Sequence, residues 1–172
     1  MSVKDLARTL PDYAKDTKLN ISSLLDDQMV DDQKKYGLLV ACAHATGYGP
    51  LIDAAEEEAA EKLSAEALTA AKGAASVMAM NNIYYRFTHL VSNGEYGQMP
   101  AKLRMSIIGK PGVDKADFEL WALAVSAING CGMCVDSHEK VLRGEGVNAD
   151  VIQYAARMAA VTFALGRSLA AA

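Results

Sequence analysis

Residues 114–144, DKADFELWALAVSAINGCGMCVDSHEKVLRG, predict two helices joined by a tight turn. Asp114 can cap a helix over 115–129, because its carboxylate can accept hydrogen bonds from the free N–H groups of the first turn. Gly130 interrupts this helix, and a second helix can begin at Cys131. Helices joined by so short a turn run antiparallel, so the stretch predicts a helical hairpin.

The rest of the chain has the same helical character. Its 172 residues are 51% hydrophobic, with four prolines and only 6% aromatic side chains. This composition, dominated by alanine, favours helices that pack closely through small side chains. No segment alternates apolar and polar residues with the period of two that a strand requires. We therefore predict an all-α fold with a single domain over residues 1–172.

Capping residues and helical spacing set the other expected boundaries. In the first half of the chain we expect a short helix capped by Asn20 that ends at Leu25, a helix capped by Asp31 or Asp32 that contains residues 34–45, and an amphipathic helix over 51–63. A long helix over 65–91, capped by Ser64, follows. The remaining helices are a short one over 99–108 and a last one over 149–169, capped by Asn148.

A faint internal repeat relates two parts of the chain. In the first, the long helix breaks at residues 81–82 and leads to His89, and in the second a helix breaks at residues 129–130 and leads to His138. The match predicts two related helical hairpin units. Because the helices are apolar over wide arcs, we also expect alanine-rich helical faces to mediate self-assembly.

Charge and composition exclude several classes of partner. The net charge of −4 without a basic run argues against nucleic acid. No apolar stretch is long and uncharged enough to predict a membrane span. Residues 1–16 carry acidic side chains where a secretory signal needs an apolar run, so we expect a cytoplasmic protein. In a reducing compartment, two cysteines separated by two residues indicate redox or metal chemistry.

The side chains that can carry chemistry follow Gly130. On a helix that begins at Cys131, the offsets 0, 3 and 7 place Cys131, Cys134 and His138 within about 60° of one another. The thiolate is the reactive form of cysteine, and both a helix start and a nearby imidazole favour it. The spacing therefore supplies two thiols able to close a disulfide and one base able to move protons.

Glu119 is a candidate fourth member of this cluster. In an antiparallel hairpin that turns at Gly130, Glu119 and His138 differ in height by three residues, roughly 4.5 Å. A carboxylate at that height could hold the imidazole in one tautomer and pass on its proton. The alternative is a solvated carboxylate near a helix start.

Two interpretations of the cluster stay open at this point. The first is a disulfide-cycling enzyme. The second is a helical scaffold or binding protein in which Cys131, Cys134, His138 and Glu119 hold a structural zinc ion, although such sites usually draw a second ligand pair from another segment. A third class, a decarboxylase or isomerase on the same fold, is disfavoured because its chemistry does not need a dithiol. Cys42 lies on an apolar helix face and is expected to be a core residue.

Residues 111–147 resemble the active-site segment of the AhpD (alkyl hydroperoxidase D) family, within the carboxymuconolactone decarboxylase-like group. The likeness continues through LPDYAKDTKLNISSL (10–24) and AMNNIYYRF (79–87). It implies an AhpD-like helical fold assembled as a homotrimer, with antioxidant activity. It further implies reduction of alkyl hydroperoxides and/or regeneration of the peroxiredoxin AhpC. No cofactor would be bound, and electrons would come from a lipoylated dihydrolipoamide acyltransferase and dihydrolipoamide dehydrogenase.

The resemblance also implies roles for the four residues. Cys134 matches the peroxidatic cysteine, which becomes a sulfenic acid. Cys131 matches the more exposed cysteine, which donates a proton, resolves the sulfenic acid and forms the mixed disulfide with a partner. Glu119 and His138 match the proton relay. Some relatives carry a histidine where this chain has Met133, so here any tuning of the thiols must come from the helix start and His138.

Overall fold

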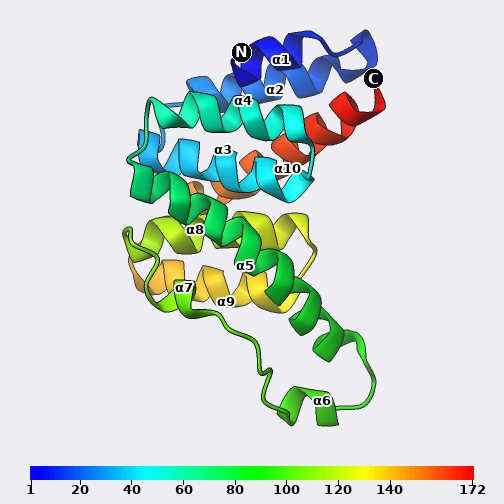
Figure 1. Ribbon diagram of the computed structural model, residues 1–172, viewed down its shortest axis with the longest axis vertical. Coiled ribbons are helices and arrows are strands. Elements are labelled where there is room, and N and C mark those ends of the chain that lie inside the picture. The colour runs from blue at the N-terminus through cyan, green and yellow to red at the C-terminus, as the bar shows by residue number, and fades with distance from the viewer.

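The computed structural model describes residues 1–172, and they form helices and connecting turns with no strand (Figure 1). The predicted all-α fold is confirmed, and no helix is both long enough and apolar enough to cross a membrane. The helices are α1 (Val3–Arg8), α2 (Lys15–Asp26), α3 (Asp32–Thr46), α4 (Gly49–Ala60), α5 (Ala65–Leu90), α6 (Glu95–Gln98), α7 (Ser106–Gly109), α8 (Lys115–Ile128), α9 (Gly132–Gly144) and α10 (Ala149–Ala171), with a 3-10 turn at Asp12–Ala14.

Capping side chains start three of the helices as predicted. Asp31 accepts a hydrogen bond from the backbone N–H of Lys34, and Ser64 accepts one from that of Ala67. Asp114 accepts from two N–H groups in the first turn of α8. Each cap satisfies donors that the helix itself leaves without a partner.

Two expected boundaries are wrong. Asn20 does not cap a helix, because α2 already begins at Lys15, directly after the 3-10 turn. The helix expected over 99–108 is limited to Ser106–Gly109. Pro100 disfavours helical backbone at Met99, and Lys102 adopts a positive φ of 52°, so the preceding residues form an irregular segment.

The helix break expected at residues 81–82 is also absent, since α5 runs without interruption from Ala65 to Leu90. The first repeat unit is therefore one long helix and not a hairpin, whereas the second is the predicted α8–α9 hairpin. Both asparagines are buried in α5, and the side-chain amide of Asn82 forms hydrogen bonds with Ser126 and Asn129.

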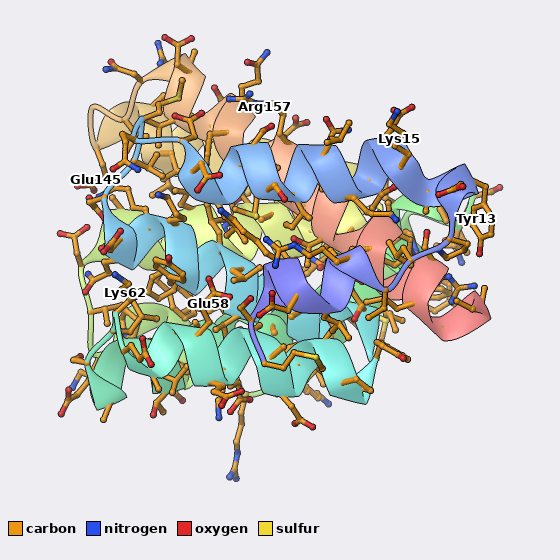
Figure 2. The ribbon with its side chains drawn as sticks, turned by 90° about the horizontal axis from the view of Figure 1, so that it is seen from above. Tyr13, Lys15, Glu58, Lys62, Glu145 and Arg157 are labelled. Atoms are coloured by element: carbon orange, nitrogen blue, oxygen red, sulfur yellow. A yellow bond between two sulfur atoms is a disulfide. The ribbon has the colours of Figure 1, made fainter.

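The core is built around α3 and α8, which α5 and α10 cover. Close packing at its centre depends on Gly37 in α3, where a Cβ atom would lie 2.2 Å from the indole ring of Trp121 in α8. Lys15, Glu145 and Arg157 are exposed, and Figure 2 shows them at the rim of the molecule.

A second close approach fixes the irregular segment that ends in α7. A Cβ atom at Gly73 of α5 would lie 2.2 Å from the Cδ1 atom of Ile107, so the missing side chain makes a slot for this isoleucine. The slot holds α7 against α5 although α7 is only one turn long. As a result, the segment that leads into α7 has a defined position beside the long helix.

Many residues of the alanine-rich faces pack inside the chain. Alanines of α3, α4, α5 and α8 are buried in one continuous core. These buried alanines are not accessible to another chain, so the expectation that alanine-rich faces mediate self-assembly does not hold for them. The exposed apolar side chains include Ile83, Phe87 and Leu90, which follow one face of α5 at helical spacing. This α5 stripe lies where the helix extends away from the other elements toward α6 (Figure 1).

Candidate active site

The turn between α8 and α9 sets the position of both cysteines. Gly130 adopts a left-handed backbone with a φ of 68°, which glycine tolerates better than any other residue. The N–H of Cys131 donates to the carbonyl of Ser126 over 3.1 Å, and the N–H of Gly130 donates to that of Ala127 over 3.2 Å. This pair of bonds defines a Schellman motif, so α8 ends and the chain reverses within two residues.

A hydrogen-bond network, buried at Ser126 and Asn82, ties this turn to α5. The Nδ2 atom of Asn82 donates to the Ser126 hydroxyl over 2.9 Å, and the Nδ2 atom of Asn129 donates to Asn82 Oδ1 over 3.0 Å. A guanidinium nitrogen of Arg86 donates to the carbonyl of Asn129. We call Asn82, Arg86, Ser126 and Asn129 the turn clamp, because they join the long helix to the reversal before Cys131.

Cys131 and Cys134 form a disulfide with a Cα–Cα distance of 5.3 Å. The second helix begins one residue later than expected, so Cys131 is the N-cap of α9 and Cys134 lies in its first turn. At this position the helix dipole favours the thiolate of Cys134 once the disulfide is reduced.

The two sulfur-bearing residues differ in exposure, in the opposite order to the one implied by the family resemblance. Cys131 is 1% exposed and Cys134 is 8% exposed, so Cys131 is the less accessible residue in this structure. The reason lies in the backbone: Cys131 follows the reversal at Gly130 and its N–H points back to Ser126 at the end of α8. Cys134, one turn further on, reaches the surface of a pocket.

Glu119 and His138 are in direct contact, as the hairpin geometry predicts. His138 Nδ1 lies 2.6 Å from Glu119 Oε2, and both side chains are buried. An ionised carboxylate can only accept, so Nδ1 carries the proton and donates it to Glu119. This bond leaves Nε2 as the ring nitrogen that can exchange a proton, 3.3 Å from the Sδ atom of Met78.

Cys134, Glu119 and His138 all line one pocket of about 310 Å³ between α5, α8, α9 and the segment that includes α7. Most of its remaining wall is apolar and includes Met78, Met105, Ile108, Met133 and Val141. Pockets that bind small organic molecules commonly enclose about 300–1,000 Å³ and combine an apolar wall with a few polar groups. The arrangement therefore places a disulfide sulfur and a hydrogen-bonded carboxylate–imidazole pair beside space for an organic molecule.

The four predicted residues do not form a zinc site in this structure. The two sulfurs are bonded to each other, and no group of three or more His, Cys, Asp or Glu side chains is arranged to hold a metal ion. Cys42 is fully buried in the core, as expected, and burial raises the pKa of its thiol. Cys42 therefore offers no competing thiolate near neutral pH.

Comparison with known proteins gives a clear family assignment. A model of the carboxymuconolactone decarboxylase family matches residues 94–172. A protein from Rhizorhabdus wittichii named alkyl hydroperoxide reductase AhpD is 67% identical over 161 residues, which is 94% of this chain and 93% of that protein. The chain belongs to the AhpD family. Proteins of the same name from Rhodopseudomonas palustris and Hyphomonas neptunium are 58% and 57% identical, over 99% of this chain and 94% and 95% of theirs.

Sequence reasoning missed the contribution of α5 to this AhpD-family site. Asn82 belongs to the turn clamp, while Met78 and Asn81 line the pocket. The sequence feature that points to a role for α5 is the adjacent pair of asparagines in an otherwise apolar helical run. Asparagine is a poor helix former, and buried polar side chains need partners. The sequence predicts a helix break at this pair, although the pair equally indicates a buried polar contact.

We expect Asn82→Ala to destabilise the protein by about 1–3 kcal/mol, because it leaves the Ser126 hydroxyl and the Asn129 amide without a buried partner. Chemical denaturation of the oxidised protein measures the change. Asn20→Ala is the matched control, since Asn20 is an exposed helical asparagine and alanine is the better helix former. Equal unfolding midpoints for Asn82→Ala and wild type would show that the turn clamp does not stabilise the hairpin.

Proposed function

We propose that this AhpD-family protein is an antioxidant thiol–disulfide oxidoreductase that reduces alkyl hydroperoxides and/or regenerates the peroxiredoxin AhpC. The observation that carries the proposal is the pocket in which Cys134 lies together with the hydrogen-bonded pair Glu119 and His138. The names of the close relatives support the same class of activity. The chemistry needs no bound cofactor, because the dithiol itself stores the two electrons.

In the peroxide reaction, the Cys134 thiolate attacks the terminal oxygen of the hydroperoxide. The sulfur–oxygen bond forms as the oxygen–oxygen bond breaks, so Cys134 becomes a sulfenic acid and an alkoxide leaves. His138 takes the thiol proton before the attack and returns a proton to the alkoxide, which departs as the alcohol. Glu119 stabilises the imidazolium that forms in between and keeps Nδ1 protonated.

The sulfenic acid is then resolved within the chain. The Cys131 thiol attacks Cys134, the disulfide forms, and the sulfenic oxygen leaves as water with the proton of Cys131. The Cα–Cα distance of 5.3 Å in the disulfide lies within the ordinary range for such a bond. Peroxide and two thiols thus give alcohol, water and one disulfide.

Reduction of the disulfide requires a dithiol partner, and we propose a lipoylated dihydrolipoamide acyltransferase kept reduced by dihydrolipoamide dehydrogenase. A partner thiolate attacks Cys131, forming a mixed disulfide and releasing the Cys134 thiolate, and the second partner thiol then frees Cys131. Because Cys131 is 1% exposed, this step requires the turn at residues 129–131 to open. For the regeneration of AhpC, we propose that the reduced Cys131–Cys134 dithiol transfers its electrons to the AhpC disulfide by the same thiol–disulfide exchange.

Rapid mixing of the reduced protein with cumene hydroperoxide distinguishes the roles of the three cysteines. We expect Cys134→Ser to abolish peroxide reduction, because no nucleophile remains in the pocket. Cys131→Ser should stop at a sulfenic acid on Cys134, detected by mass spectrometry after trapping with a dione. Cys42→Ala is the control and should behave as wild type, since Cys42 is outside the site. A wild-type protein that oxidises neither with the peroxide nor with the AhpC disulfide would refute the proposed function.

Removal of either member of the proton pair should slow the reaction with peroxide and with AhpC disulfide. General acid–base catalysis contributes on the order of 10²–10⁴ in rate, and we expect Glu119→Ala and His138→Ala to lose part of that factor. The double variant should lose less than the product of the two single losses, because both residues act on one proton path. Glu139→Ala is the matched control on the exposed side of α9. Wild-type rates for both single variants would exclude the relay.

We also propose that the protein is a homotrimer, in which the α5 stripe lies in the interface. Ile83 and Leu90 are 63% and 72% exposed, which is unusual for apolar side chains that share one helix face. Light scattering should therefore give a mass three times that of a single chain for the wild type. Phe87→Glu, which places a charge in the stripe, should lower the mass while Glu139→Ala leaves it unchanged. A single-chain mass for the wild type across micromolar concentrations would contradict the trimer.

A further inference from the structure

One polar atom of the pocket has no partner. Asn81 lies on α5, is 4% exposed and lines the pocket beside Cys134. Its Oδ1 atom is buried and accepts no hydrogen bond from any protein group. Folded proteins leave few buried polar atoms unsatisfied, because each lost hydrogen bond to water costs free energy. Because Asn81 lines the pocket, its unsatisfied acceptor points to a ligand that donates a hydrogen bond.

The orientation of this amide is fixed by its other end. Asn81 Nδ2 lies 3.2 Å from the Sδ atom of Met105. A thioether sulfur can accept a hydrogen bond but cannot donate one, so the NH₂ group must face Met105. Oδ1 is thereby left as the acceptor on the other side of the amide.

The other polar side chains of the pocket are engaged with each other or reach solvent, and the partly exposed Tyr85 is one of those that reach solvent. Glu119 and His138 are bonded to each other, and Ser137 is exposed at the mouth. The wall around Asn81 carries the sulfur atoms of three methionines together with Ile108 and Val141. Methionine adapts to apolar groups of varied shape, so this wall suits an alkyl or aryl group better than a polar one.

We propose that Asn81 is a substrate-binding residue whose Oδ1 accepts the O–H of an organic hydroperoxide, while the methionine-rich wall holds the organic group. The inference deepens the proposed function and rests on it. Asn81 exchanges no electrons and no proton in this step. It holds the terminal oxygen, which passes to the Cys134 sulfur when the oxygen–oxygen bond breaks, and the alkoxide takes its proton from His138.

Binding to the oxidised protein tests the acceptor without any turnover. The probes are 2-phenyl-2-propanol, which has an O–H donor, and its methyl ether, which has none. We expect the wild type to bind the alcohol about five- to tenfold more tightly than the ether, the usual contribution of one hydrogen bond. In Asn81→Leu the two affinities should be equal within about twofold. A purely structural role of Asn81 would weaken both probes and keep their ratio.

Kinetics of the reduced protein supply the second measurement. Asn81→Leu should lower the rate constant for oxidation by cumene hydroperoxide about tenfold. Its reaction with methyl methanethiosulfonate, a thiol reagent without an O–H donor, should stay within about twofold of wild type, because thiol activation is unchanged. Ser137→Ala tests the competing hydroxyl at the same pocket, and Glu139→Ala is the matched control, since Glu139 is exposed on α9 and does not line the pocket.

The outcomes distinguish this inference from the proposed function. A wild-type protein that does not react with cumene hydroperoxide would refute direct peroxide reduction and the role of Asn81 with it. A wild-type protein that reacts, together with an unchanged rate in Asn81→Leu, would refute only the role of Asn81. If the wild type binds alcohol and ether equally, the acceptor is not used, and this result needs no variant that might fold poorly. A larger loss in Ser137→Ala than in Asn81→Leu would assign the acceptor to Ser137 and overturn the inference.

Discussion

At Gly130 the chain ends one helix and reverses within two residues, and the geometry of the site follows from that reversal. The Schellman bonds stop α8 at a defined residue, so the register between α8 and α9 is fixed. This register brings Glu119 and His138 to 2.6 Å of each other although 19 positions separate them in sequence. It also makes Cys131 the N-cap of α9 and places Cys134 in the first turn, where the helix dipole acts on its sulfur.

The hairpin alone does not complete the site, because α5 supplies its third side. One stretch of this helix contributes Met78 beside the imidazole, Asn81 in the pocket wall and Asn82 in the turn clamp. An alanine-rich helix can approach its neighbours closely, and the few polar residues on such a helix then become buried. Close packing of α5 through its alanines buries Asn82, and a buried amide needs hydrogen-bond partners. Ser126 and Asn129, at the end of α8, supply them.

Sequence patterns predicted the parts of the fold that depend on neighbouring residues. The caps at Asp31, Ser64 and Asp114, the stop at Gly130 and the contact between Glu119 and His138 all follow from local propensity and helical spacing. These features are determined within one helix or one hairpin, so they do not require knowledge of the other elements.

Several errors concern residues whose positions or contacts are set by distant parts of the chain. The pair at residues 81–82 looks like a break until Ser126 and Asn129 are seen to satisfy Asn82. The alanine-rich faces look like an interface until the other helices cover them. The family resemblance implies an exposed Cys131, and the sequence contains no local signal for how the turn covers its sulfur.

The slot at Gly73 has a consequence for how such a site can diversify. Ile107 fills this slot and anchors an irregular segment whose Met105 and Ile108 form part of the pocket wall. The sulfurs and the proton pair, by contrast, lie on the α8–α9 hairpin. Part of the pocket wall thus lies on a different piece of chain from the sulfurs and the Glu119–His138 pair. Mutations between residues 99 and 108 can remodel the room available to an organic group during evolution while the reacting atoms keep their positions.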